Sequence, residues 1–369
     1  MELVPSVLFL VLKGVSTALF RRLVLRRKTV ASWSIPLECA VAVTRLMVDS
    51  EVSEEDVKAY REGSQARDHL VRKRERVTAL KDGLTDAPAF PGCAVIPAMI
   101  EHIKAEWYVP KSCESSFAAV DSSEKDRTVV INMHGGAFVM GTLNMFRTHT
   151  SRMAVTLGMS VIGFEYRLMP KHRFGNILDD AMTMFTHLRD ILGYKPSKIV
   201  LAGDSAGGHL ALSLALHLRQ QGFEGPGAVV VLSPWVDPGS YSEDVNSTTG
   251  FKEFGHIDIM GKGTQMLQLG SLAFSTDDSY RSLLLPDIVQ QARYLPPCLV
   301  QVGGCEVFLP AISEFVRLVN NGNTVTGAEK VRFEVFKDQI HGFQMMGDLT
   351  PATQQALDSA ASFLRDVNL

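Results

Sequence analysis

The chain lacks the patterns that define several classes of protein. Its 369 residues include only five cysteines, which are scattered and show no Cys-x-x-Cys spacing, so neither a disulfide framework nor a zinc site is indicated. No set of His, Cys and Asp residues has metal-ligand spacing, and we expect no metal. The net charge is −3 and no basic stripe with interleaved aromatic residues is present, so we expect no nucleic-acid partner.

Phosphate-binding motifs and long apolar runs are missing too. The segment 203–208 is rich in glycine but lacks the lysine of a phosphate-binding loop, and no strand–turn–helix pattern carries Gly-x-Gly-x-x-Gly, so we expect no cofactor. Lys13 interrupts the apolar stretch 3–20, which leaves no run long enough to cross a bilayer. What remains is an ordinary globular composition, 46% hydrophobic and 21% charged. The length fits one large α/β domain with an appendage, or two domains.

From residue 128 onward, short apolar segments alternate with segments of helical periodicity. This alternation predicts an α/β fold with a mainly parallel sheet that helices cover on both faces. The expected strands are 129–133, 160–166, 199–202, 228–232, 298–302 and 331–336, preceded by a strand or hairpin at 94–110. The expected helices include 33–48, 152–157, 177–192, 209–221 and 351–367.

Two regions fall outside this alternation. Residues 1–90 are predicted to be helical material outside the sheet, so that 91–369 forms the sheet-containing domain. Residues 237–287 are rich in Gly, Ser and Asp with apolar residues interspersed, which predicts an insertion above the carboxyl ends of the strands. We expect this insertion and the N-terminal helices to form a lid together.

The pattern Gly-x-Ser-x-Gly stands between a predicted strand and a predicted helix. Ser205 is its central residue, with Gly203 and Gly207 two positions away on either side. Side chains at those two positions would collide in so tight a turn, which explains why both are glycine. The arrangement is typical of a nucleophile elbow, which places a serine hydroxyl at a helix N-terminus. The structural alternative is a serine that only caps the helix.

A serine hydroxyl needs a base before it can act as a nucleophile. His341 lies just after the last predicted strand, in a loop that faces the elbow in this fold class, although a surface histidine without this role is the alternative. The chain order serine, acid, histidine places the third member between these two, and Glu306 follows a predicted strand there. We therefore predict a catalytic triad of Ser205, Glu306 and His341, with Asp338 and Glu314 as competing acids.

The tetrahedral intermediate of acyl transfer needs N–H donors for its negatively charged oxygen. Gly135 and Gly136 follow the predicted strand 129–133, where the backbone can turn its N–H groups toward the serine. The N–H of Ala206, next to the nucleophile, would be a third donor. We predict that these three residues form the oxyanion hole.

Together these motifs resemble the hormone-sensitive-lipase-like branch of the α/β-hydrolases over roughly residues 95–369. The segment 134–137, His-Gly-Gly-Ala, is similar to the oxyanion motif His-Gly-Gly-Gly of that branch, and 203–208 matches its elbow. Tyr-Arg-Leu-Met-Pro at 166–170, with Asp180, resembles a segment that gives structural support. The resemblance implies the α/β-hydrolase fold and carboxylic-ester hydrolysis without a metal or organic cofactor, under a mobile cap.

The chain departs from the pattern of that branch at a few positions. Ala137 replaces the third glycine, and Glu306 stands where Asp is more usual, followed by Pro310 and Ala311 in place of an acidic pair. These features resemble the subset that contains epsilon-lactone hydrolases and esterases of fungal secondary-metabolite clusters.

The resulting hypothesis is a serine esterase or lactonase that acts on a small to medium apolar ester, with secondary metabolism as the setting that the resemblance implies. Two alternatives remain open. An acyltransferase would use the same triad with an alcohol in place of water, and a binding protein on a hydrolase scaffold would bind a ligand without hydrolysing it. A homodimer is the assembly that is common in the family resembled.

The apolar stretch 3–20 and the basic run 21–28 allow three interpretations: a cap helix over the active site, an interfacial membrane helix, or a short membrane anchor. The positive charge follows the apolar part, whereas a secretory signal carries it before. The scattered cysteines fit a reducing compartment. We therefore predict a cytoplasmic protein, with peripheral membrane contact through this stretch as the alternative.

Overall fold

The computed structural model of the chain describes residues 32–62, 87–113, 127–241, 245–321 and 330–369, with residues 12, 13, 15, 16, 18, 19, 29, 30 and 71 in addition. The predicted N-terminal stretch 3–20 and the basic run 21–28 therefore lie largely outside the described residues. None of the helices formed by the described residues has the length and apolar character needed to cross a membrane.

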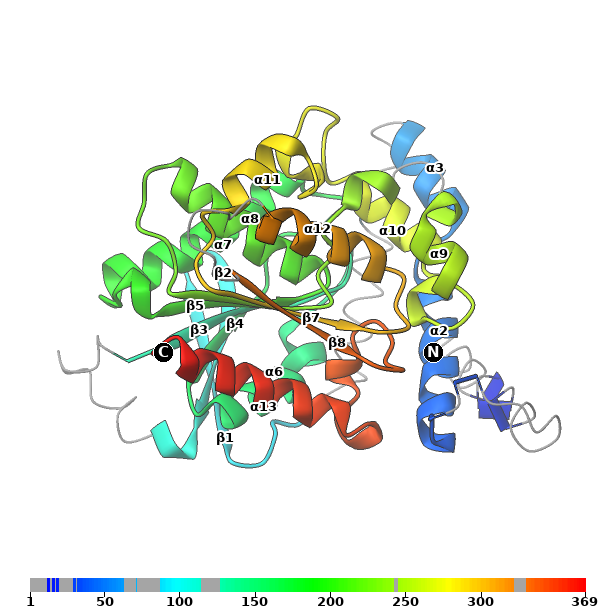
Figure 1. Ribbon diagram of the computed structural model, residues 1–369, viewed down its shortest axis with the longest axis horizontal. Helices are drawn as coiled ribbons and strands as arrows, with labels where there is room; N and C mark the ends of the chain where they lie inside the picture. Colours follow the sequence, from blue (N-terminus) through cyan, green and yellow to red (C-terminus); the bar gives the residue numbers. More distant parts are fainter. Residues whose placement is uncertain are drawn as a thin grey trace.

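An eight-stranded sheet forms the centre of the molecule, in the order β1-β2-β4-β3-β5-β6-β7-β8 (Figure 1). Its strands are β1 Cys93–Ile100, β2 Ile103–Pro110, β3 Val129–Met133, β4 Ser160–Phe164, β5 Ile199–Asp204, β6 Ala228–Leu232, β7 Cys298–Gly303 and β8 Val331–Phe336. Only the pairs β1–β2 and β2–β4 are antiparallel. All six later strands were expected from the apolar runs, and the segment 94–110, predicted as a strand or hairpin, is a hairpin, so the predicted α/β fold with a mainly parallel sheet is confirmed.

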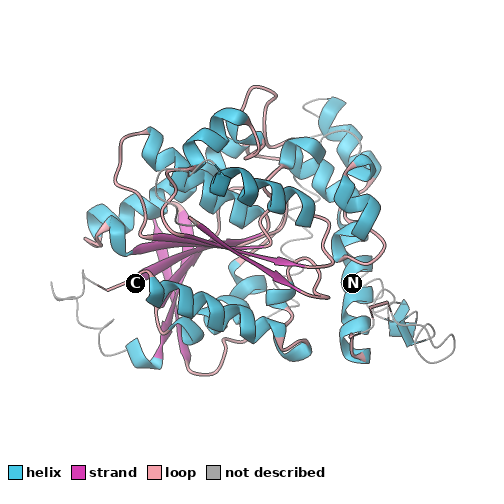
Figure 2. Ribbon diagram, viewed as in Figure 1, coloured by secondary structure: helices cyan, strands magenta, loops and turns pink. Residues whose placement is uncertain are grey.

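Helices cover both faces of the sheet (Figure 2). One face carries α6 Leu143–Leu157 and α13 Ala352–Asp366, and the other carries α7 Phe174–Thr186, α8 Ala206–Gln220 and α12 Leu309–Asn321 (Figure 1). The predicted helical segment 152–157 is the last part of α6, which begins at Leu143 after the cap Thr142, whose hydroxyl accepts the N–H of Met145 at 3.3 Å. The expected helix 177–192 divides into α7 and a π-helical turn over His187–Ile191.

The two faces of the sheet bury alternate residues of each strand. In β5, Ile199 and Leu201 belong to the core on one face, whereas Val200 and Ala202 belong to the core on the other. This parity follows from the two-residue period of a strand. A strand that is buried on both faces must be apolar at nearly every position, which is why β3, β5, β6 and β7 were visible in the sequence as continuous apolar runs.

The register of the parallel strands brings several loops to one edge of the sheet. Met133 at the end of β3 pairs with Gly203, and Asp204 at the end of β5 pairs with Leu232 at the end of β6. The loops after β3, β5, β6, β7 and β8 therefore leave the sheet from the same edge, where α/β proteins place their binding sites.

A helical layer stands beside this edge. It consists of α2 Ile35–Glu51, α3 Glu54–Glu62, α9 Thr249–Phe254 and α10 Thr264–Ser271, which lie together at one end of the molecule (Figure 1). The 3-10 turn Ile259–Lys262 packs against α2, and α10 packs against both α2 and α3. Further along the chain, after α10, comes helix α11, Pro286–Ala292.

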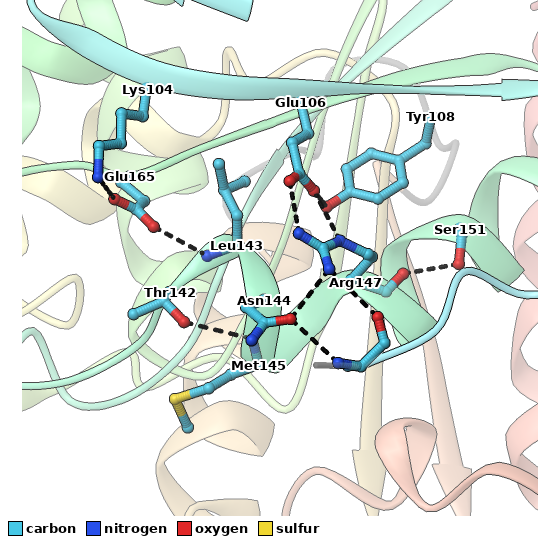
Figure 3. A network of polar contacts seen from close by, with 11 residues as sticks. Lys104, Glu106, Tyr108, Thr142, Leu143, Asn144, Met145, Arg147, Ser151 and Glu165 are labelled. Atoms are coloured by element: carbon cyan, nitrogen blue, oxygen red, sulfur yellow. Dashed lines mark hydrogen bonds and ion pairs between the residues drawn. The ribbon is translucent and has the colours of Figure 1, made fainter. Parts of the chain in front are cut away.

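A polar network fastens the antiparallel edge of the sheet to α6 (Figure 3). Arg147 of α6 donates from Nη2 and Nε to the two carboxylate oxygens of Glu106 in β2, at 2.7 and 3.2 Å, and Tyr108 donates its hydroxyl to the same carboxylate at 2.8 Å. Asn144 Oδ1 accepts both the Arg147 side chain and the N–H of Ala87, at 3.0 Å each. The bidentate ion pair thus also holds the segment that leads into β1.

Candidate active site

Ser205 occupies a strained turn between β5 and α8. Its backbone has φ 52° and ψ −118°, a conformation that residues with a side chain adopt rarely. The turn is held by neighbouring backbone: the N–H of Ser205 donates to the carbonyl of Leu232, and its carbonyl accepts the N–H of Trp235, both at 2.9 Å. The turn sets the serine hydroxyl at the N-terminus of α8.

The glycines on either side of Ser205 are required by contact. A Cβ atom at Gly203 would overlap the carbonyl of Gly207, and a Cβ atom at Gly207 would overlap the carbonyl of Met133. The prediction that both positions must be glycine is confirmed, because in each case the obstacle is backbone that cannot move aside.

His341 meets Ser205 directly. It lies in the loop between β8 and α13, and its Nε2 is 2.9 Å from the Ser205 Oγ, a hydrogen-bonding distance. Both side chains are nearly enclosed, with 8% of Ser205 and 3% of His341 exposed. The ring of Phe308 stands edge-on to the imidazole with centroids 4.7 Å apart and restricts its orientation.

Glu306 lies on the other side of the imidazole, in the turn after β7. It is fully buried, and its Oε1 is 3.6 Å from His341 Nδ1, which is ion-pair distance but longer than a hydrogen bond. Within the described part of the chain neither of these two atoms has another hydrogen-bond partner. The second carboxylate oxygen accepts the Ser233 hydroxyl at 2.6 Å and the N–H of Gly303 at 2.8 Å, which fixes the side chain.

The two competing acids lie elsewhere. Glu314 is on α12, where it forms an ion pair with Arg317 at 2.6 Å. Asp338 lies in the turn after β8, and its main-chain carbonyl accepts the indole N–H of Trp33 at 2.6 Å. The structure therefore brings Glu306, and neither competitor, to within ion-pair distance of His341.

Charge around His341 favours its protonated form. Burial alone would lower the pKa of the imidazole, but the carboxylates of Glu306, Asp258 and Asp204 together raise that pKa above its ordinary value. An imidazole placed in this way can accept a proton from Ser205 and hold it.

The predicted oxyanion residues divide into two groups. The N–H of Gly135 already donates to the Asp204 Oδ1, at 2.9 Å. The N–H groups of Gly136 and Ala206 donate to no acceptor within the described residues. Gly136 has φ 112° and Ala137 φ 54°, so the backbone turns sharply after Gly135.

The segment 166–170 contacts the same loop. The Tyr166 hydroxyl donates to the carbonyl of His134 at 2.5 Å, and the two rings stack with centroids 4.2 Å apart. Asp180 accepts the backbone N–H of Arg167 at 2.8 Å and its side chain at 2.9 Å. The supporting role expected for this segment is therefore visible as contacts.

Sequence reasoning missed one charged residue of the site, Asp258. It is fully buried in the 237–287 segment, and its carboxylate accepts the backbone N–H of His341 at 3.0 Å and of Val307 at 2.7 Å. Burial raises its pKa to about 6. An isolated acidic residue in a Gly, Ser and Asp-rich stretch has no local pattern that could have identified it. Within the described ranges no group of three His, Cys, Asp or Glu side chains could hold a metal ion.

Comparison with known proteins agrees with this geometry. Residues 130–345 match a protein family described by its alpha/beta hydrolase fold, and the chain belongs to that family. The chain is 30% identical to an esterase of Acinetobacter venetianus, over 65% of this chain and 76% of that protein. It is 31% identical to the carboxylesterase/phospholipase LipF of Mycobacterium tuberculosis, over 64% of this chain and 62% of LipF, so it spans less than two thirds of LipF.

Among solved structures, an esterase from the bacterial hormone-sensitive lipase family is 25% identical, with a TM-score of 0.62 over 88% of this chain and 97% of that one. Within the family, the chain is a hormone-sensitive-lipase-like carboxylic ester hydrolase.

Proposed function

We propose that the protein hydrolyses small to medium apolar esters through an acyl-enzyme on Ser205. His341 Nε2 takes the hydroxyl proton as the serine oxygen attacks the ester carbonyl, and then returns it to the departing alcohol oxygen. Water then attacks the acyl carbonyl and gives a proton to the same nitrogen, which returns it to the Ser205 oxygen as the acyl–oxygen bond breaks and the acid leaves. The observation that carries the proposal is the 2.9 Å contact between the two side chains at a strained strand-to-helix turn.

Glu306 is the proposed acid of the triad. Its free oxygen faces the Nδ1 of His341, so it can hold the imidazole in the tautomer that leaves Nε2 as the acceptor and can stabilise the imidazolium. The distance of 3.6 Å suits an enzyme without substrate, because catalytic hydrogen bonds often tighten only when the substrate binds.

The proposed oxyanion hole uses Gly136 and Ala206, with Ala137 as the next donor along the loop. The N–H of Ala206 belongs to the first residue of α8, where helix geometry leaves it unbonded and positively polarised. Donors of this kind stabilise the oxygen of the tetrahedral intermediate, each by roughly 3–4 kcal/mol.

A stack of aromatic rings that begins at His341 supports a small apolar acyl group. Phe138, Trp235 and Phe308 form a stack, with centroids 6.2 and 6.1 Å apart and planes inclined by 26° and 18°. All three are fully buried; the Phe308 ring contacts His341, and the main-chain N–H of Trp235 donates to the main-chain carbonyl of Ser205. Rings in these positions favour an apolar acyl chain and limit its length. A lactone is a cyclic ester whose alcohol stays attached to the acyl group, so the same chemistry can open it. Secondary metabolism as the setting of this activity stays a prediction.

The same proposal includes a cap made of the N-terminal helices and the 237–287 insertion. Gly270 of α10 packs closely on the loop after β3, which carries the proposed oxyanion donors. A Cβ atom at Gly270 would overlap the carbonyl of Ala137 in that loop. The contacts of α10 with α2 and α3 join the two cap segments above the loop.

A fluorophosphonate probe tests the proposal, with mass spectrometry of the modified peptide. We expect modification at Ser205 and turnover of p-nitrophenyl acetate or butyrate, both lost in Ser205→Ala. Unchanged turnover in Ser205→Ala would refute the assignment. Product analysis with an added alcohol separates hydrolysis from acyl transfer, and tight ligand binding without turnover would indicate a non-catalytic protein.

A further inference from the structure

One buried carboxylate bonds to both loops that carry the acid and the base. Asp258 Oδ1 accepts the N–H of His341 at 3.0 Å, and Oδ2 accepts the N–H of Val307, the residue after Glu306, at 2.7 Å. The two loops follow different strands, β8 and β7, and Asp258 comes from neither, because it lies in the insertion between α9 and α10.

The choice of a carboxylate at this position has a physical reason. Each of the two N–H groups is bonded to its own oxygen, and a carboxylate supplies two acceptor oxygens on one rigid plane. Bonds from N–H groups to an ionised acceptor are stronger than neutral ones, which offsets the cost of burying the charge. An amide would offer one acceptor and present its NH2 group to the second N–H.

Asp258 is in turn fastened to the N-terminal helix α2. Arg45 of α2 donates to the main-chain carbonyls of Asp258 and Gly255, at 2.7 and 3.1 Å. Just before the same helix, Trp33 donates its indole N–H to the carbonyl of Asp338, three residues before His341. The helix α2 therefore bonds to the Asp258 segment, and the residue just before its N-cap bonds to the His341 loop.

We propose that Asp258 is a positioning residue that sets the separation of Glu306 and His341 by bonding to the main chain of both loops. Catalysis is sensitive to such placement, since a shift of about 1 Å can cost on the order of a hundredfold in rate. The inference rests on the proposed roles of Glu306 and His341. Arg45 supports the same geometry from α2 without contacting the reacting atoms.

The variant Asp258→Asn tests the proposal on p-nitrophenyl acetate. We expect kcat to fall by roughly tenfold to a hundredfold, with KM changed by less than about threefold, because the substrate contacts remain while the catalytic geometry loosens. The exposed Asp287→Asn, at the end of the same insertion, is the matched control and should keep wild-type kinetics.

A second readout separates positioning from general structural support. If Asp258 acts through the Glu306–His341 pair, its replacement should cost little in a Glu306→Gln background, so the two losses should not multiply. Fully multiplicative losses, or a rise in KM with kcat unchanged, would overturn the proposal. Wild-type turnover that survives in Ser205→Ala would instead show that the proposed function itself is wrong.

The pH profile gives a third readout. The carboxylates of Glu306, Asp258 and Asp204 act on His341, and Tyr241 and Cys305 also lie within the electrostatic reach of Asp258. Removing the charge of Asp258 should move the acid limb of kcat/KM to lower pH, whereas a purely structural defect would leave the limb in place. An unmoved limb counts against the proposal.

If Asp258→Asn fails to fold, Arg45→Met tests the same idea from the helix side. It removes the two bonds to the main chain of the Asp258 segment and leaves every buried carboxylate in place. We expect a severalfold loss of kcat with KM preserved, and wild-type kcat in this variant would contradict the proposal.

Discussion

The carboxylate of Asp204 accepts the N–H of Gly135, with 2.9 Å between Oδ1 and N. This bond ties the residue before Ser205 to the loop after β3, so Ser205 and that loop are held at one separation. It also explains why Gly135 has no side chain, because a Cβ atom there would overlap the same carboxylate. The N–H groups left for the proposed oxyanion hole are those of the residues that follow Gly135 and of Ala206.

Gly136→Ala should therefore impair catalysis. At φ 112° an alanine is strained, and its Cβ atom would overlap the carbonyl of Met140, so the loop must move and its N–H with it. We expect kcat to fall by roughly 10²–10³-fold, as for the loss of one oxyanion donor. Steady-state kinetics on p-nitrophenyl acetate measures this. Gly175→Ala is the matched control, because a Cβ atom at Gly175 meets nothing within 4 Å, and a wild-type rate in Gly136→Ala would contradict the assignment.

Replacing the proposed acid should cost far more than replacing either competitor. In Glu306→Gln the imidazole loses the negative charge that faces Nδ1, and we expect kcat to fall by about 10³-fold or more. Glu314→Gln and Asp338→Asn should keep activity within about twofold, since neither carboxylate lies at His341. Kinetics of the three variants, with thermal unfolding to confirm that each is folded, decides among the acids; a large loss in Asp338→Asn alone would transfer the role to that residue.

Activity should fall on acidification through a pKa above the ordinary value of histidine. His341 must be neutral to accept the serine proton, and its pKa is raised because neighbouring carboxylates outweigh the effect of burial. The active form is therefore present above the raised pKa and is lost as the pH falls through it. A pH profile of kcat/KM measures this limb, and in Glu306→Gln it should move to lower pH. A limb below the ordinary histidine value would contradict the electrostatic account.

Much of the fold could be predicted from the sequence because its evidence is local. The strands buried on both faces are continuous apolar runs, and the elbow glycines follow from sterics within five residues of chain. The start of α6 at Leu143 was missed because its first turns are mixed in polarity, and only the capping bond of Thr142 reveals it.

The candidate site likewise has residues that local sequence patterns predict and contacts that no local pattern predicts. Ser205, Glu306 and His341 each follow a strand, and parallel strands bring such positions together, so their convergence could be anticipated. The bonds of Asp258 to His341 and Val307 cross long stretches of chain and leave no local pattern. The partner of the Gly135 N–H was missed for a related reason, because Gly135 and Asp204 are 69 residues apart in the chain.

Shortening the aromatic stack should widen the range of acyl groups. In Trp235→Leu the ring between Phe138 and Phe308 is replaced by a smaller side chain, which opens space within the stack next to the ring that contacts His341. We expect the ratio of kcat/KM for p-nitrophenyl octanoate over acetate to rise by about tenfold, the order of the selectivity that a few methylenes can carry. Phe185→Leu, a buried ring on α7 outside the stack, should leave the ratio unchanged. An unchanged ratio in Trp235→Leu would place the acyl group elsewhere.

The burial of Asp204 should make the protein less stable at neutral pH than at acidic pH. Burial raises its pKa from 3.8 to about 7, so the folded state binds more protons than the unfolded state between these values, and the free energy of unfolding falls as the pH rises through them. From pH 5 to pH 8 this residue alone should lower that free energy by about 3 kcal/mol. Asp204→Asn keeps an acceptor for the N–H of Gly135 and should lack this loss, whereas the exposed Asp179→Asn should behave as the wild type. Urea unfolding at the two pH values measures the difference, and parallel pH dependence in wild type and Asp204→Asn would show that Asp204 is ionised in the folded protein at pH 5.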